Sequence, residues 1–194
     1  VHGVFDKVLC NKIDLYVAAS EKYYEIEPGP EAAHNLAILF ISKNDFIKGA
    51  KYLKEAVADA GTDCNVRAEW YYELAIVSRA NKDYCDAITY AREAVALKSD
   101  LGKAYIVMGD AFIDSRENLG SDFDQRAAFW AAADKYAKAK SVDPGVADEA
   151  NKKISDYAGQ YPHNEEVFFR DMKDGDSYMV KGCINEYTTV RGRK

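Results

Sequence analysis

The sequence has few of the residues from which catalytic and metal sites are usually built. Its three histidines stand far apart, and no His-Glu-x-x-His motif, Gly-x-Ser-x-Gly motif or phosphate-binding loop surrounds them. Its four cysteines are widely spaced, with no Cys-x-x-Cys pair and no histidine at ligand spacing. We therefore expect Cys10, Cys64, Cys85 and Cys183 to be four unrelated thiols, and we expect no metal, no cofactor and no catalysis.

Long apolar runs and basic stripes are also absent. No apolar run is long enough to span a bilayer. The net charge is −6 and no expected helix carries a stripe dense in lysine and arginine, which argues against nucleic acid and anionic membranes as partners. Because the chain opens Val1-His2-Gly3 without methionine, we expect a piece of a longer protein, either cytoplasmic or periplasmic.

Small and apolar residues recur with helical spacing. Three segments share an aromatic residue, a small residue and two further packing positions: Phe46, Gly49, Leu53 and Ala56; Tyr84, Ala87, Ala91 and Ala94; Phe129, Ala132, Tyr136 and Ala139. Each follows a segment with a stripe of its own: Ala33, Leu36, Ala37 and Phe40; Tyr71, Leu74, Ala75 and Ser78; Tyr105, Met108, Gly109 and Phe112. The repeating unit is therefore a helix pair, and the chain is predicted to be all-α.

The spacing of the pairs indicates the kind of array. Ala75 and Gly109 take the same place in successive first helices and are 34 residues apart (109 − 75), which is the tetratricopeptide period. Over about residues 30–144 the chain resembles the tetratricopeptide repeat (TPR) family, and the segment from Asp83 to Asp100 is similar to that family's second helix and following turn. The resemblance implies a right-handed α-solenoid whose stacked helix pairs bury a continuous core.

The repeats depart from a regular array in two places. Ala37 and Ala75 are 38 residues apart (75 − 37), which places Cys64 in a longer loop between the first two repeats. The third repeat has eleven more residues between its helices than the second (23 − 12), and we assign this insertion to the segment 114–126. We expect this insertion to be an extended helix end or a surface loop anchored by Phe123, although it could also overhang a binding surface.

Prolines and composition divide the chain. Pro30 and Pro144 stand where new helices are expected to begin, because a first-turn residue needs no amide partner. We predict one or two N-terminal helices or a partial repeat at 1–29, TPR-like repeats at 30–63, 68–101 and 102–144, a capping helix at 145–161, and a tail with a short β-hairpin at 162–194. The tail resembles the ends of uncharacterised bacterial TPR-containing proteins, which implies a common cap and no known activity.

The resemblance also implies a concave groove lined by the first helices of successive repeats. Side chains offset from the packing stripe are expected to face it: His34, Ile38 and Ile41; Glu69, Tyr72, Ile76 and Arg79; Lys103, Ile106, Asp110 and Ile113. We predict a floor of Ile38, Ile76 and Ile106 and an ion pair between Arg79 and Asp110. The alternative is that these residues pack under the next turn of the solenoid or under the tail.

The expected function is that of an adaptor that binds a peptide or helix of a partner protein in this groove. Cochaperones of the family hold acidic C-termini with lysine and asparagine, but the matching places here are His34, Ile38 and Glu73, with only Lys103 basic, so that ligand is disfavoured. Two alternatives stay open. The chain could be a structural segment of a larger protein whose groove is filled by its own chain, or an accessory module of a secreted or periplasmic assembly.

Overall fold

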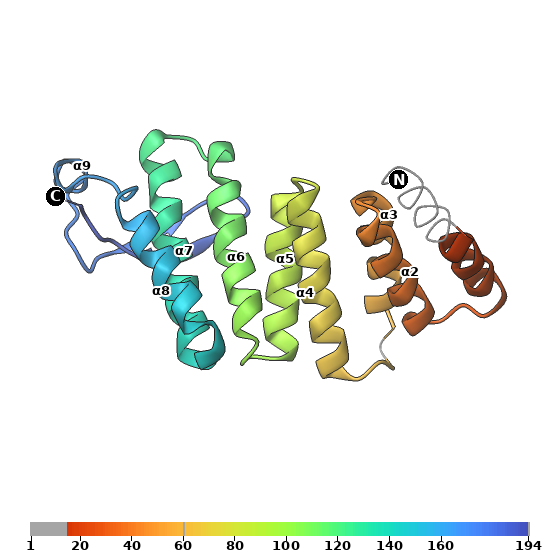
Figure 1. Cartoon of the computed structure of the whole chain (residues 1–194). Coiled ribbons are helices and arrows are strands. Elements are labelled where there is room, and N and C mark those ends of the chain that lie inside the picture. The colour runs from red at the N-terminus through yellow and green to blue at the C-terminus, as the bar shows by residue number, and fades with distance from the viewer. Residues whose placement is uncertain (1–14, 60, 194) are drawn as a thin grey trace, which may run out of the picture.

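The computed structural model describes residues 15–59 and 61–193 as an array of helices that stand side by side (Figure 1). Residues 15–26 form the first helix of this part. The elements that follow are α2 (Pro30–Ser42), α3 (Phe46–Val57), α4 (Cys64–Ala80), α5 (Tyr84–Leu97), α6 (Gly102–Asp114), η1 (Arg116–Asn118), α7 (Asp122–Val142), η2 (Pro144–Val146), α8 (Ala147–Ala158), α9 (Asn164–Phe168), β1 (Ser177–Val180) and β2 (Glu186–Thr189). No helix of the described part combines the length and the apolar character needed to cross a bilayer.

The two helices of the pair α2–α3, and likewise those of the pair α4–α5, are joined by a turn of the same kind. Asn44 and Lys82 stand at equivalent places in these turns, with φ angles of 60° and 67°. This left-handed conformation ends the first helix and reverses the chain. Asp45 then accepts a hydrogen bond from the amide of Lys48 at 3.1 Å and caps α3. Each pair is thus a first helix folded back on a second helix.

The small residues of the predicted stripes lie where helices cross. Ala37 and Ala75 are fully buried, and Gly109 takes the same place in α6. A Cβ atom at Gly109 would lie 2.6 Å from Cε1 of Tyr136 in α7, so the tyrosine ring packs directly on the α6 backbone. Tyr136, together with Trp130 and Phe112, is among the largest fully buried side chains of the core. The stripes therefore become the contacts that hold successive helices together.

The third pair has a longer connection and a longer second helix. After α6 the chain makes the short turn η1, and α7 then begins with a capping box between Ser121 and Asp124. Leu119 and Phe123 are buried, 8% and 3% exposed, against this end of the array. The inserted residues thus form a turn and the first turns of a 21-residue helix.

Helix α8 continues the array beyond α7. Pro144 opens the η2 turn that leads into α8, and the Asp143 side chain accepts from the amide of Gly145 at 2.9 Å. The ring of Tyr157 in α8 packs against Phe129 and Tyr136 of α7, with centroids 5.6 Å and 6.4 Å apart. The last pair is therefore covered by a further helix.

The tail lies against second helices rather than first helices. β1 and β2 pair antiparallel, with Ser177 opposite Thr189. Trp130 of α7 donates its indole N–H to the carbonyl of Arg191 at 2.7 Å, and Thr188 donates to Asp134 of α7 at 2.6 Å. The hairpin alone would be marginally stable, and these contacts anchor it to α7.

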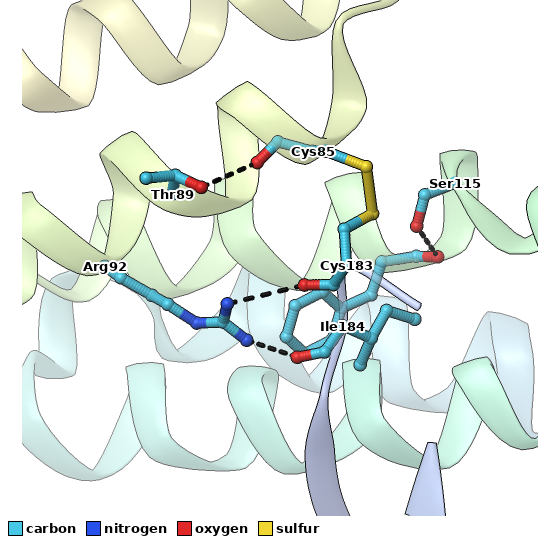
Figure 2. The surroundings of a disulfide bond; sticks show 7 residues. Cys85, Thr89, Arg92, Ser115, Cys183 and Ile184 are labelled. Carbon is cyan, nitrogen blue, oxygen red and sulfur yellow. Dashed lines mark hydrogen bonds between the residues drawn. A yellow bond between two sulfur atoms is a disulfide. The ribbon is translucent and has the colours of Figure 1, made fainter. Parts of the chain in front are cut away.

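A disulfide joins the tail to α5, and this overturns the expectation of four unrelated thiols. Cys85 of α5 is bonded to Cys183, which precedes β2 (Figure 2). The pairing depends on the tail folding back over α5, so the spacing of cysteines in the sequence could not show it. Cys64 is a free, exposed cysteine and is the first residue of α4, not a loop residue as predicted. Cys10 lies outside the described residues.

The described part of the N-terminal segment packs on the first repeat. Val17 is buried in one cluster with Leu36 and Phe40 of α2. Tyr24 donates to Glu55 of α3 at 2.6 Å. The predicted helix of residues 15–26 is present, and the part of that prediction that concerns residues 1–14 lies outside the described residues.

Candidate partner-binding surface

All eleven predicted groove residues lie on the first helices α2, α4 and α6. We call the side of the array formed by α2, α4, α6 and α8 the first-helix face. Most polar groove residues on this face are bound to one another across neighbouring helices. Their first effect is therefore to fix the spacing of the repeats.

Helices α2 and α4 are linked through His34. Its Nε2 atom lies 2.6 Å from Oε2 of Glu73, and its ring stacks on Trp70 with centroids 4.9 Å apart. Trp70 is itself buried, with 6% of its surface exposed. His34 thus packs between the first two repeats and offers only part of its surface to a partner.

Helices α4 and α6 are linked near their beginnings through Lys103. Its ammonium lies 2.6 Å from Oε2 of Glu69 and 4.4 Å from the centre of the Tyr72 ring. Lys98 lies 3.2 Å from the other oxygen of the same carboxylate. Burial acts to raise the pKa of Glu69, but the hydrogen bonds from Lys103 and Lys98 outweigh it and hold this pKa below its ordinary value.

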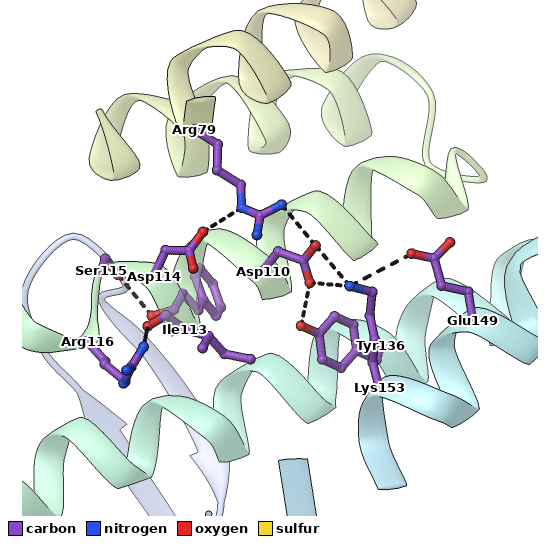
Figure 3. Close-up of polar contacts among 10 residues, drawn as sticks. Arg79, Asp110, Ile113, Asp114, Ser115, Arg116, Tyr136, Glu149 and Lys153 are labelled. Atoms are coloured by element: carbon purple, nitrogen blue, oxygen red, sulfur yellow. Dashed lines mark hydrogen bonds and ion pairs between the residues drawn. The ribbon is translucent and has the colours of Figure 1, made fainter. Parts of the chain in front are cut away.

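Arg79 links α4 to α6 at the other end of the helices (Figure 3). Its Nη1 atom lies 3.2 Å from Asp110, which confirms the predicted ion pair, and its Nε atom lies 2.6 Å from Asp114. Asp110 also accepts from the hydroxyl of Tyr136 at 2.7 Å and pairs with Lys153 of α8 at 2.8 Å. One carboxylate therefore ties together four helices, α4, α6, α7 and α8.

Burial and charge act together in this cluster. Desolvation, the nearby Asp110 charge and the hydrogen bond to it raise the pKa of Tyr136 far above its ordinary value, so this hydroxyl stays a hydrogen-bond donor. Burial acts to lower the pKa of Arg79, but the bonds to Asp114 and Asp110 outweigh it and raise this pKa. The cluster therefore holds opposite charges in a defined arrangement between α4, α6, α7 and α8.

The prediction that Ile106 floors an open groove is wrong. Ile106 is 4% exposed and Ile113 is 6% exposed, because α6 is enclosed by its neighbours and ten of its residues are buried. Asp110 is 8% exposed for the same reason. Ile41 is half-buried and lies against Gly49 of α3, so it belongs to the packing of its own helix pair.

Ile38 and Ile76 are the exposed isoleucines of the first-helix face, at 39% and 40% exposure. They lie in two separate clefts. Ile76 lines a cleft of about 380 Å³, the central cleft, together with Arg79, Lys82, Tyr84, Val107 and Asp114. Ile38 lines a cleft of about 760 Å³, the N-terminal cleft, between α2 and the helix of residues 15–26. The predicted continuous groove is therefore divided.

A third cleft of about 630 Å³ adjoins the central one. It lies between the ends of α6 and α8 and the beginning of α7, and is lined by Ile113, Asp114, Arg116, Gln125, Phe129 and Tyr157, among others. Because Asp114 lines both clefts, we treat them as one trough, the α4–α8 trough, which crosses the C-terminal ends of α4, α6 and α8.

The sequence prediction missed several trough residues. Asp114 was assigned to the insertion, although its place four residues after Asp110 puts both carboxylates on one helical face. Tyr84 was assigned to the packing stripe of α5, yet it also lines the central cleft. No signal in the sequence marks Gln125 or Tyr157, because only the fold brings the start of α7 to the end of α8. Among the described residues, no cluster of His, Cys, Asp or Glu could hold a metal ion.

Comparison with known proteins identifies the fold. No family model matches the chain, and no curated protein matches it in sequence. Two crystal structures of MamA are similar to this chain, with sequence identities of 21% and 20% and a TM-score of 0.56 each. The matched regions cover 85% and 87% of this chain, and 95% and 91% of the two MamA chains. YrrB, described as a TPR protein with an unusual peptide-binding site, is 16% identical with a TM-score of 0.55, covering 87% of this chain and 74% of its own. The chain is therefore an α-solenoid of TPR-like helix pairs.

Proposed function

We propose that this protein is an interaction module that binds an extended peptide segment of a partner protein in the α4–α8 trough and catalyses no reaction itself. The observation that carries the proposal is that two clefts, which share Asp114 in their linings, lie across the ends of three stacked helices. Two neighbouring clefts of about 380 and 630 Å³ suit a chain segment better than a single small molecule. Peptide binding described for YrrB, a protein of similar fold, supports the same class of ligand.

The trough offers the mixed chemistry that a peptide needs. Ile76 is 40% exposed beside Val107, and burying it under an apolar side chain of the peptide is favourable. Gln125 and Arg116 stand in the adjoining cleft, where their amide and guanidinium groups can bond to a peptide main chain. Arg79 is held by Asp110 and Asp114, so little side-chain freedom is lost when a ligand arrives.

The proposal is tested by photo-cross-linking from a defined position. A benzophenone amino acid replaces Ile76 in one version of the protein and Ile47 in another. Ile47 is the matched control because it is 77% exposed but lies on α3, a second helix. We expect one partner protein to be captured from Ile76 and not from Ile47, with the cross-linked peptide identified by mass spectrometry.

The same partner is then purified and its binding measured with an Ile76→Asp variant. A charge at the floor of the central cleft is expected to weaken binding about tenfold or more, because the carboxylate must be desolvated under the peptide. Equal capture from both positions, or unchanged affinity of Ile76→Asp, would reject the trough as the binding site.

The two alternative functions are affected differently by the structure. Residues 186–191 of the tail bind α5 and α7 through Arg92, Trp130 and Asp134, which argues against this part of the tail as the segment that fills the trough. If the groove is filled by the protein's own chain, another segment would therefore have to fill it.

The Cys85–Cys183 disulfide favours a module of an exported assembly, since disulfides persist mainly in oxidising compartments. Alkylation of the protein in intact host cells, followed by mass analysis, tests this: a cytosolic protein would be alkylated at both cysteines.

A further inference from the structure

The repeat register shows which residues of a first helix face the first helix before it. Ala37, Ala75 and Gly109 are equivalent positions of α2, α4 and α6, as their spacing and burial show. Two places before them stand Asn35, Glu73 and Val107, and one place after them stand Ile38, Ile76 and Asp110. These two places let the N-terminal helix α2 be compared directly with α4 and α6.

One of these two places contacts the preceding first helix in α4, and the other does so in α6. Glu73 of α4 binds His34 of α2, and Asp110 of α6 binds Arg79 of α4. In α2 the same places are Asn35 and Ile38, and both line the N-terminal cleft. Among the described residues no first helix precedes α2, so this cleft lies where the interface between first helices would continue.

The other wall of the cleft is a helix in the position of a second helix. Tyr24 of the helix at residues 15–26 contacts α3 through Glu55 and the ring of Tyr52, 5.6 Å between centroids. In the same way α3 contacts α5, where Lys54 lies 3.6 Å from Asp86. In each helix pair, one side of the second helix packs against the first helix of the same pair. In the helix at residues 15–26, the corresponding side carries Tyr16 and Tyr23, which are 65% and 55% exposed and line the cleft.

We propose that the N-terminal cleft binds one amphipathic helix of a partner protein, which docks there as a first helix does in the rest of the array. The site goes beyond the α4–α8 trough and does not depend on it. Helices α2 and 15–26 are each about three turns long, so the bound helix spans about three turns. Its apolar face covers Ile38, Tyr16 and Tyr23, which are costly to leave in water.

The array also specifies the sequence of the bound helix. Each first helix has a small residue, Ala37, Ala75 or Gly109, where it crosses its neighbour. In α2 and α6 a large residue stands one place before the small residue and another stands three places after it. In α4 and α6 an aromatic residue stands four places before the small residue. Six places before it stand Glu31, Glu69 and Lys103, and Glu69 and Lys103 pair at 2.6 Å between α4 and α6. A lysine or arginine at that place of the bound helix would meet Glu31 in the same way. The partner helix is therefore recognised by a central alanine or glycine and a cation six residues earlier.

The probe for this proposal is a fluorescent synthetic peptide with the sequence of residues 101–115. It carries the required pattern, with Lys103, Tyr105, Met108, Gly109 and Phe112 in register. Binding to the whole 194-residue protein is measured by fluorescence anisotropy. A second peptide with leucine in place of Gly109 is the matched control, because a large residue at the crossing prevents close approach.

The protein variants Ile38→Asp and Ile76→Asp separate the two sites, because the two isoleucines are almost equally exposed. We expect Ile38→Asp to weaken peptide binding about tenfold or more and Ile76→Asp to leave it within about twofold. Circular dichroism checks that both variants keep their helices. No anisotropy change with the unaltered protein, or equal loss in both variants, would overturn the proposal, while failure of the trough experiment would not affect it.

Charge reversal tests the register. Glu31→Lys is expected to weaken the probe several-fold, and a peptide with glutamate in place of Lys103 is expected to bind Glu31→Lys better than it binds the unaltered protein. A peptide whose affinity ignores the sign at residue 31 would refute docking in the register of the array.

Discussion

Cys85 and Cys183 are 98 residues apart in the sequence and form a disulfide that fixes the tail to α5 (Figure 2). Two turns further along α5, Arg92 donates hydrogen bonds to the carbonyls of Cys183 and Ile184 and pairs with Glu186 at 2.8 Å. The covalent bond and the guanidinium therefore hold the same short segment. This arrangement makes the segment from Cys183 to Glu186 a part of the folded array, on the side of the second helix α5.

Loss of the disulfide should lower the free energy of unfolding. In the chain-entropy account, closing a loop of this length restricts the unfolded chain, and native disulfides typically contribute about 2–4 kcal/mol. We expect Cys183→Ser to lose an amount in this range, measured by urea denaturation without reductant. Cys64→Ser is the control, since Cys64 is free and exposed, and it should change stability by less than about 0.5 kcal/mol. Equal stability of the two variants would mean that the disulfide adds nothing.

Asp110 is the residue whose loss should most weaken the link between the last repeats. Its side chain is 9% exposed, and its carboxylate holds Arg79, Tyr136 and Lys153. Asp110→Ala leaves the Tyr136 hydroxyl without its acceptor and removes the nearest carboxylate of Lys153, while Arg79 keeps Asp114. Removing one member of a largely buried charge cluster costs up to about 3–5 kcal/mol. Thermal and urea unfolding would measure the loss.

Asp114→Ala is the matched control for Asp110→Ala, because Asp114 binds the same guanidinium at 2.6 Å. Its side chain is 30% exposed, against 9% for Asp110, so water can replace much of the lost contact. We expect a loss of about 1 kcal/mol or less. If the two variants were equally destabilised, burial would not be what makes Asp110 important.

The helix pairs could be predicted from the sequence because their signal is local and repeated. Stripes such as Tyr71, Leu74 and Ala75 recur at helical spacing, and the same spacing that aligned Ala75 with Gly109 also placed Arg79 and Asp110 on adjacent helices. A pair that depends on register alone can thus be found without a structure.

The tail and the division of the groove could not be predicted in this way. Cys85 and Cys183 meet only because residues 177–191 fold back over α5 and α7, a contact that no periodicity encodes. Ile106 stands three places before Gly109 and Ile76 stands one place after Ala75, so the two isoleucines lie one turn apart on the same side of their stripes. Ile106 is nevertheless buried and Ile76 exposed, because α6 is enclosed on more sides than α4. Burial of an offset residue depends on what covers its helix, which the repeat pattern does not contain.

Gly109→Ala should destabilise the protein although alanine is the better helix former. Alanine in a helix interior gains about 1 kcal/mol over glycine. The added Cβ, however, would lie 2.6 Å from Cε1 of the fully buried Tyr136, and overpacking of this kind costs about 1–3 kcal/mol. We expect a lower melting temperature. Gly159→Ala, where nothing lies within 4 Å of the new atom, should leave the melting temperature unchanged or raise it slightly; the reverse order would exclude a tight crossing at Gly109.

Attachment of the tail should weaken at alkaline pH through Tyr178. Burial and the hydrogen bond to Asp124 raise the pKa of Tyr178 to about 12, whereas a free tyrosine titrates near 10. Between these values the folded protein keeps a proton that the unfolded chain releases. The stability from this group is therefore complete below about pH 10 and is lost as the pH rises through about 12.

Tyr178→Phe removes the titrating hydroxyl and should flatten this part of the pH dependence. The measurement is the free energy of unfolding in urea at about pH 9 and about pH 11.5, compared between the two proteins, so that the other tyrosines cancel. At the lower pH the variant is expected to be less stable, because Asp124 loses a hydrogen-bond donor. At the higher pH the gap should narrow. Tyr187→Phe, on the same hairpin but 71% exposed, should follow the unaltered protein at both pH values; if it instead matched Tyr178→Phe, the effect would not come from the contact between Tyr178 and Asp124.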